Sequence, residues 1–207
     1  KNGQFFTSKE TALFMASLFD LSSFSKEISI LDPGAGSGIL TAALVQRIID
    51  TDKIKTIKIT CYETDGDILE LLNKNLLWIR DNSPLKIEYK IVKDNYITSQ
   101  TLEYNNMLGA CTEPEKYDVI IGNPPYLKIG KTANEALSMP DICYGAPNLY
   151  FLFMEMASFN LVDNGELVFI VPRSWTSGAY FKKFREKFLS EVTLKHIHLF
   201  VSRDKVF

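Results

Sequence analysis

Two patterns of hydrophobic and polar positions alternate along this chain. Apolar residues recur at helical spacing from Ala12 to Phe19 and over 39–49, 66–79, 148–160 and 177–189. Short apolar runs of strand length lie between them, at 28–31, 57–62, 85–92, 117–121 and 167–171. A spacing of three or four residues predicts amphipathic helices, and short apolar runs predict buried strands. Because strands and helices alternate, the pattern predicts an α/β domain with a mostly parallel sheet and helices on both faces.

The pattern also marks where the regular elements stop. Residues 7–10, Thr-Ser-Lys-Glu, have the spacing of a helix N-cap, and the run at 192–201 predicts at least one more strand, with an antiparallel edge as one option. Residues 99–116 and 127–147 show no clear periodicity. Unpatterned segments of this length in a compact domain are usually functional lids or disordered, so both are candidates for a functional role.

Composition bounds the class of protein. The 207 residues suit one domain, and 46% hydrophobic and 23% charged residues are typical of a globular chain. The formal charge, 23 − 25 = −2, lacks the basic excess of a stand-alone nucleic-acid binder. Three scattered cysteines lack the spacing of a zinc site, and Cys61 is expected to be a small core residue. Without a signal peptide or an apolar run long enough to cross a bilayer, a reduced cytoplasm is the expected location.

The string Asn123-Pro124-Pro125-Tyr126 follows the buried run at 117–122, so it should lie where a strand ends. Ligands of open α/β sheets bind at that edge. The Asn123 side-chain oxygen and the Pro124 carbonyl can accept the two hydrogens of a nucleobase amine, which directs its lone pair at an electrophile. Proline fixes φ and has no N–H to compete. Tyr126 offers a ring on which a base can stack, worth about 1–3 kcal/mol. A plain proline-rich turn is the alternative.

A glycine-rich turn follows the first predicted strand. Asp32 precedes a G-x-G-x-G pattern, which differs from the G-x-G-x-x-G of dinucleotide sites and opens a helix. The turn brings backbone N–H groups to the sheet edge. With an acid ahead of it, it suits a ligand that carries an ammonium better than a pyrophosphate. The residues predicted to contact this ligand are Asp32, Gly34, Ala35, Gly36 and Gly38.

Two further acids end the second and third strands. Glu63 can accept both hydroxyls of a ribose, and Asp94 can accept from an adenine amino group while Tyr96 packs on the ring. Each feature alone has another explanation. The glycine-rich turn is common in α/β folds, Glu63 could be a solvated charge, and Asp94 could be a turn former. Together they predict a nucleoside-binding cleft whose natural occupant is S-adenosylmethionine.

With these residues in hand, the chain resembles the catalytic domain of a γ-class N6-adenine DNA methyltransferase of bacterial restriction–modification systems. The resemblance is carried by residues 3–7, 31–38, 62–65, 93–96, 123–126 and 148–150. It implies that Thr7 binds the methionine end of the cofactor and that Thr64 and Asn95 belong to the ribose and adenine motifs. Ser8 stands where the family usually has Pro. Residues 171–175 followed by Phe181 are similar to the segment whose ring holds the flipped base, although Phe181 is equally explained as a core residue.

The resemblance implies a Rossmann-like, S-adenosylmethionine-dependent methyltransferase fold of the seven-stranded type. It implies double-stranded DNA as the substrate, with the adenine flipped out of the stack between Tyr126 and Phe181, and no metal. Residues 1–207 are then expected to be a catalytic fragment whose target-recognition region or specificity subunit lies outside this chain, with a nuclease as a further partner. Lys182, Lys183 and Arg185 are candidates for phosphate contacts or solvated surface. Methylation of RNA adenine or of a protein glutamine, and a scaffold that only binds the cofactor, stay open as alternatives.

Overall fold

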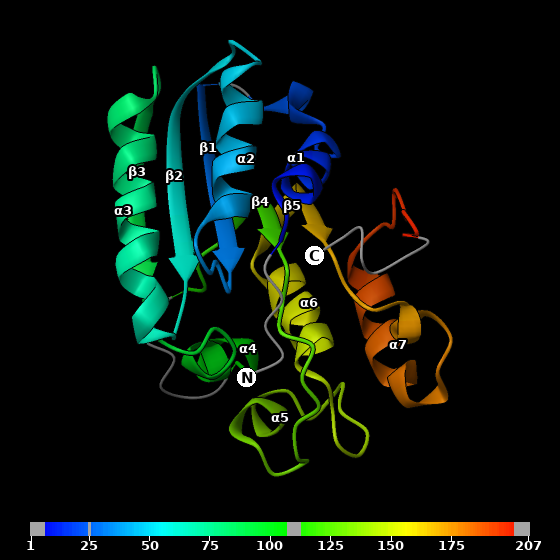
Figure 1. Cartoon of the computed structure of the whole chain (residues 1–207). Helices are drawn as coiled ribbons and strands as arrows, with labels where there is room; N and C mark the ends of the chain where they lie inside the picture. The colour runs from blue at the N-terminus through cyan, green and yellow to red at the C-terminus, as the bar shows by residue number, and fades with distance from the viewer. Residues whose placement is uncertain (1–6, 25, 107–112, 201–207) are drawn as a thin grey trace.

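A five-stranded parallel sheet forms the centre of the computed structural model, which describes residues 7–24, 26–106 and 113–200. The strand order is β3-β2-β1-β4-β5, and each neighbouring pair is parallel (Figure 1). The strands are β1 (Lys26–Pro33), β2 (Ile54–Tyr62), β3 (Lys86–Val92), β4 (Tyr117–Gly122) and β5 (Leu161–Phe169). The predicted α/β class with a parallel sheet is confirmed.

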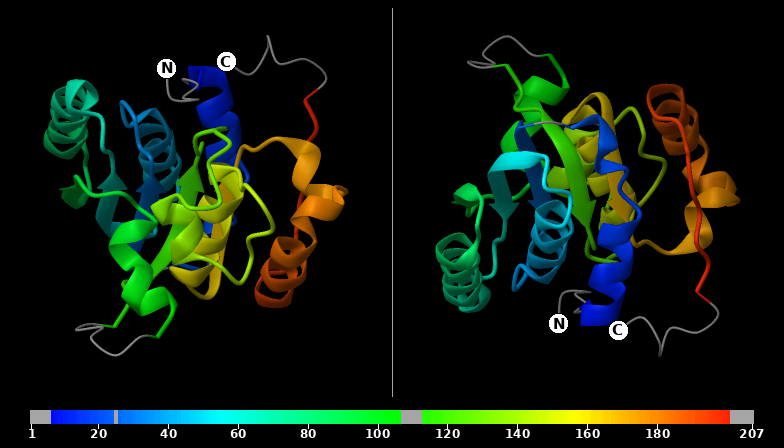
Figure 2. Two further views of the ribbon diagram at one scale, coloured as in Figure 1. Left: turned by 90° about the horizontal axis from the view of Figure 1, so that it is seen from below. Right: turned by 90° about the horizontal axis from the view of Figure 1, so that it is seen from above.

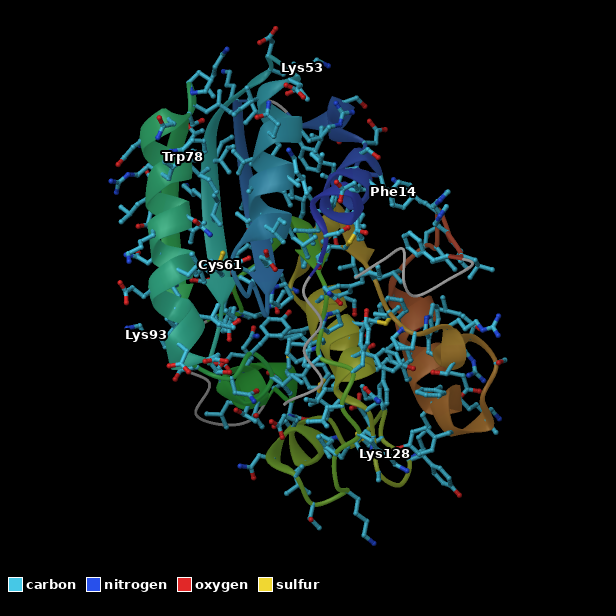
Figure 3. The ribbon with its side chains drawn as sticks, in the orientation of Figure 1. Phe14, Lys53, Cys61, Trp78, Lys93 and Lys128 are labelled. Atoms are coloured by element: carbon cyan, nitrogen blue, oxygen red, sulfur yellow. The ribbon has the colours of Figure 1, made fainter. Side chains whose placement is uncertain are left out.

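Helices cover both faces of this sheet, as predicted (Figure 2). On one face, α1 (Lys9–Ser17), α2 (Ile39–Ile49) and α3 (Gly66–Asn82) pack on Ile28 and Ile30 of β1 and on Val119 and Ile121 of β4. On the other face, α6 (Leu149–Phe159) and α7 (Lys182–Glu191) share a core with Leu31 and Ile120. The two cores thus use alternate residues of the same strands, as the period of two in a strand requires. Cys61 is fully buried in the first core, inside the molecule (Figure 3), as expected.

The unpatterned segments hold short helices that lie beyond the arrowheads of β1 and β2 (Figure 1). They are α4 (Thr101–Tyr104), with a 3-10 turn at Thr98–Gln100 before it, and α5 (Asn134–Ser138). The loop that carries α5 is closed at its base, because Leu149 N donates to Leu127 O and Ile129 N to Pro147 O, both at 2.8 Å. The segment after Tyr126 is therefore an ordered loop, fixed at both ends.

The sequence-based prediction was wrong in the last third of the chain. Strand β5 begins at Leu161 rather than 167, because the polar residues that hid its start form an irregularity with Asn164 at φ 62°. The helix predicted from 177 begins at Lys182, after Gly178 in an extended conformation and a 3-10 turn at Ala179–Phe181. Residues 192–200 form no strand, and the described part of the chain has five strands rather than seven. Instead, His198 and Phe200 pack on Phe14 of α1, with ring centroids 4.7 and 6.0 Å away.

A buried carboxyl joins the elements on the α6 side. Glu155 of α6 is fully buried, and its Oε1 lies 3.3 Å from Nζ of Lys187 on α7. Lys187 also lies 2.6 Å from Oδ2 of Asp141, in the α5 loop, and donates to the Tyr104 hydroxyl at 2.6 Å. Burial raises the pKa of Glu155 to about 7, although Lys187 acts in the opposite direction. One side chain of α7 thereby ties together α4, the α5 loop and α6.

Replacing Glu155 with Gln should remove a pH dependence of the free energy of unfolding. The carboxyl keeps its proton up to a pKa of about 7 in the folded protein, against an ordinary value of 4.5. Unfolding between these pH values releases a proton, so the wild-type protein loses stability as the pH rises from 4.5 to 7. We expect the stability difference between wild type and variant to change by about 3 kcal/mol over this range, measured by urea unfolding at several pH values.

Glu10→Gln, on the exposed side of α1, is the matched control and should keep the wild-type pH slope. An unchanged slope in Glu155→Gln would show that burial of Glu155 does not hold its proton.

Candidate cofactor and catalytic site

The site lies where the chain reverses direction across the sheet. Strand β1 pairs with β2 on one side and with β4 on the other, in register Ile30↔Val119 and Leu31↔Ile120. A carboxylate strengthens this pairing, because Asp118 Oδ2 accepts from both the backbone N and the Oγ of Ser29 at 2.7 Å. Ligands of open α/β sheets bind outside the carboxyl ends of the strands at such a switch point. The glycine turn after β1 and the Asn-Pro-Pro-Tyr string after β4 flank this point.

A cavity of about 300 Å³ opens at this edge. The structure gathers around it many of the residues that the sequence singled out: Gly34, Gly36, Glu63, Thr64, Asp94, Asn95, Tyr96, Asn123 and Pro125. It adds Tyr62 and Leu149, which lie in the quoted motifs but had no assigned contact, and four residues that the sequence reasoning missed: Ile68, Leu127, Glu135 and Phe153. The remaining predicted residues, which are Thr7, Asp32, Ala35, Pro124, Tyr126, Phe181 and Gly38, do not line it.

The glycine turn after β1 forms one wall of the cavity. Gly34 N and Ala35 N both donate to Tyr62 O at 2.9 Å, which fastens the turn to the end of β2. Gly38 has φ 82°, and a Cβ at this position would lie 2.9 Å from Cδ1 of Leu72 in α3. Ala35 is buried in the core. Ala35 and Gly38 therefore shape the turn, while Gly34 and Gly36 reach the cavity.

Glu63 is held rigidly at the cavity wall. Its Oε1 accepts from the backbone N of Thr64 and Asp65, both at 2.8 Å, and its Oε2 accepts from Gly36 N at 2.9 Å. Only 5% of the residue is exposed. Three backbone donors fix the carboxylate in place, so a ligand hydroxyl meets an acceptor that needs no rearrangement.

Asp32 lies outside the cavity wall, between β1 and α2. It is fully buried, its Oδ2 accepts from Thr41 Oγ1 at 2.7 Å, and its Oδ1 has no hydrogen-bond partner. Burial raises its pKa to about 7, against the effect of the Thr41 hydrogen bond. The Asp32 carboxyl therefore links the end of β1 to α2 through Thr41 instead of facing the cavity.

Aromatic rings and polar side chains form the far end of the cavity, where β3 ends. The Tyr96 ring is buried 5.0 Å from the Tyr62 ring and 5.2 Å from the Phe153 ring, and its hydroxyl donates to Asn160 Oδ1 at 2.8 Å. Asp94 is exposed beside them. This end of the cavity offers a ligand apolar ring surface together with a carboxylate.

Asn123 is held from both ends of its amide. Its Nδ2 donates to Thr7 Oγ1 at 3.0 Å, and its Oδ1 accepts from the Tyr126 hydroxyl at 2.9 Å. That hydroxyl also lies 2.8 Å from Ile170 O. A tyrosine has one hydroxyl hydrogen, so the Tyr126 hydroxyl donates to one of these two acceptors at a time and can change between them.

Gly122, directly before Asn123, brings β4 close to β5, since a Cβ there would lie 1.9 Å from the Phe169 ring.

The two rings expected to hold a base both lie close to a third ring. Tyr150, at the start of α6, has its ring centroid 6.3 Å from that of Tyr126 and 6.1 Å from that of Phe181. Phe181 is partly buried and also packs on Phe151 at 5.5 Å. Arg185 is a structural residue, because its Nη1 donates to Trp175 O at 2.8 Å and to Gly178 O at 2.7 Å. It thus supports the turn that leads to Phe181.

The character of the cavity fits a neutral or cationic nucleoside ligand. Within the described part of the chain its lining includes the carboxyl groups of Glu63, Asp94 and Glu135 but no lysine or arginine. Such a wall provides acceptors for hydroxyl and amino groups and, among its described residues, no cationic side chain to pair with a pyrophosphate. In the same residues we find no group of three or more His, Cys, Asp or Glu side chains that could hold a metal ion. None of the described helices is long and apolar enough to span a bilayer.

Comparisons with known proteins agree with this geometry. The chain is 37% identical over 214 residues to Type II methyltransferase M.PstI of Providencia stuartii, and 33% identical over 208 residues to Type II methyltransferase M.BsuBI of Bacillus subtilis. These alignments cover 100% and 99% of this chain but 40% of each relative. In fold it is similar to the type I restriction-modification system methyltransferase subunit from Streptococcus thermophilus, with a TM-score of 0.65 at 18% identity over 92% of this chain and 40% of that chain.

Residues 20–207 match the family described as Eco57I restriction-modification methylase. The match covers most of the chain and confirms the restriction–modification resemblance that the motifs indicated. The chain belongs to the Eco57I restriction-modification methylase family.

Proposed function

We propose that this chain is the catalytic domain of a site-specific DNA methyltransferase that transfers a methyl group from S-adenosylmethionine to N6 of adenine, as the modification part of a restriction–modification system. One observation carries the proposal: Asn123 and the glycine turn line a single cavity that has no lysine or arginine among its described lining residues. The first supplies the acceptor that amine methylation needs, and the second lies where a nucleoside cofactor binds in this fold class.

Different cavity residues contact different parts of the cofactor. Gly34 and Gly36 leave room for the part that lies against the backbone of the glycine turn, and Glu63 accepts from the ribose hydroxyls. Phe153 and Tyr62 provide ring surface for its base. When bound, S-adenosylmethionine supplies a methyl group that its positively charged sulfur already activates. Catalysis by the chain is then mainly a matter of positioning.

Asn123, Pro124 and Tyr126 orient the amine. The Asn123 oxygen and the Pro124 carbonyl accept the two N6 hydrogens, which frees the nitrogen lone pair to form the new bond to carbon. For this, the Tyr126 hydroxyl gives up Asn123 Oδ1 and donates to Ile170 O, 2.8 Å away. The carbon–sulfur bond of the cofactor would break and leave neutral S-adenosylhomocysteine, while the nitrogen gains the methyl group and releases one proton to solvent, so no side chain has to act as a base.

The target base must leave the duplex to reach Asn123, at the edge of this cavity. We propose that Tyr126 stacks on it and that Phe181 closes its other side. Relatives of the chain are more than twice its length. We propose that contacts to DNA phosphates and the reading of its sequence come from parts of the protein outside this chain, which agrees with the formal charge of −2.

RNA adenine and a protein glutamine offer amines of similar geometry, so the product decides between the substrates. We expect the full polypeptide that contains this chain, incubated with duplex DNA and radiolabelled S-adenosylmethionine, to form N6-methyldeoxyadenosine. The measurement is chromatography of the digested DNA, with RNA of the same sequence and release-factor protein as parallel substrates. Label that enters only RNA or protein would overturn the proposal, and cofactor binding without transfer to any of them would indicate a scaffold.

Replacing Asn123 with Ala should abolish methyl transfer and leave cofactor binding within about twofold of wild type. The variant removes an acceptor for the amine, and such positioning losses reach about a hundredfold or more in rate. Radiolabel transfer and calorimetric titration with S-adenosylhomocysteine measure the two effects separately. Asn82→Ala, the same change on the exposed end of α3, should leave both unchanged. Turnover at the wild-type rate in Asn123→Ala would refute the role of the amide.

Replacing Glu63 with Gln should lower the affinity for S-adenosylhomocysteine about ten- to a hundredfold. The amide would direct N–H hydrogens at backbone donors that now donate to both oxygens, so the acceptor for the ribose would turn or move. Calorimetric titration gives the affinity, and thermal unfolding shows whether the fold is kept. Glu70→Gln, on the exposed side of α3, serves as the control. Equal affinities in all three proteins would exclude Glu63 from the binding site.

A further inference from the structure

Glu135 reaches the cavity from a segment in which sequence patterns predicted no element. It belongs to α5, within the loop that follows the Asn-Pro-Pro-Tyr string, and it lines the cavity together with residues from the ends of β2 and β3. Its Oε1 accepts from Nδ2 of Asn95 at 2.9 Å. This contact places Glu135 at the β3 end of the cavity, next to Asp94.

Several contacts hold Glu135 in this position. Ser138, one turn further along α5, is buried and shares a hydrogen bond of 2.7 Å with Thr101, while its carbonyl accepts from Asn105 Nδ2 at 2.8 Å. Ala136 and Met139 are buried in the core beneath the helix. Because α5 is fastened to α4 and packed into the core, Glu135 has a fixed backbone from which to meet a ligand.

Asn95 is already occupied as an acceptor. Its Oδ1 accepts from the backbone N of Ile97 at 3.0 Å and from that of Thr98 at 3.1 Å, so its Nδ2 is the group that points to Glu135. The Asn95 amide therefore links the end of β3 to α5 by hydrogen bonds. The acceptors that this end of the cavity presents to a ligand are carboxylates, from Glu135 and from Asp94.

We propose that Glu135 is a ligand-binding residue that selects the purine at the nucleoside end of the cavity. Its carboxylate accepts a hydrogen from a 6-amino group and has nothing to offer a 6-oxo group. It therefore favours an adenine nucleoside over a hypoxanthine nucleoside. This inference rests on the proposed cofactor and extends it to a residue outside the strand-end motifs.

Glu135→Gln in the otherwise unchanged chain tests the proposal. Gln keeps an oxygen for Asn95 Nδ2, so the hydrogen bond between α5 and the end of β3 is kept, but it replaces the other oxygen with an N–H donor. Calorimetric titrations with S-adenosylhomocysteine and with S-inosylhomocysteine, which differs in carrying a 6-oxo group, give the two affinities. We expect the variant to bind S-adenosylhomocysteine about tenfold more weakly and to lose most of the wild-type preference for it over the inosyl compound.

The ratio of the two affinities separates recognition from loss of structure, because partial unfolding lowers both by the same factor. A variant that keeps the wild-type ratio, whether or not both affinities fall, would overturn the proposal. Glu186→Gln, on the exposed face of α7, should behave as wild type. Wild-type protein that does not bind S-adenosylhomocysteine would instead refute the proposed cofactor, a result distinct from equal discrimination by the two proteins.

Discussion

The pairing of β1 with β4 is the constraint on which the site depends. The two strands are far apart in the sequence, and their hydrogen bonding places the glycine turn and the Asn-Pro-Pro-Tyr string at one edge. The Asp118 carboxylate adds two hydrogen bonds from Ser29 to this pair, one from the backbone and one from the hydroxyl. A one-residue slip of β4 would turn Val119 and Ile121 away from their core. The burial of the sheet therefore fixes the position of Asn123.

Around this fixed edge, the polar groups differ in how firmly they are held. The Glu63 carboxylate accepts from three backbone N–H groups, none of which can move without opening the turn or the end of β2. The Tyr126 hydroxyl has a choice, since Asn123 Oδ1 and Ile170 O are nearly equidistant from it. The cofactor side of the site is thus pre-organised. On the proposed substrate side, the Tyr126 hydroxyl can release Asn123 Oδ1 and donate to Ile170 O instead.

Local pattern predicted most of the fold and part of the site. The strand ends at Glu63 and Asp94 were found because parallel strands bring their carboxyl ends to one edge. Leu127 and Glu135 of the α5 loop gave no such signal, since a five-residue helix has too few positions to show a period. The start of β5 was hidden by the polar residues of its irregular turn. Sequence pattern also could not show that Asp32 faces α2, because both faces of that strand are buried.

The loop between Tyr126 and α6 links the parts that sequence motifs treat separately. It starts at the Asn-Pro-Pro-Tyr string and presents Glu135 to the cavity. Before α6 begins, its Asp141 contacts Lys187. Lys187 lies on α7, directly after the turn that carries Phe181, and α7 also holds that turn through Arg185. Phe181, proposed to hold the base, and the loop that carries Glu135 are therefore both supported by α7. If a base enters as proposed, a displacement of α7 would act on Asp141 through Lys187, and through Asp141 on the loop that carries Glu135.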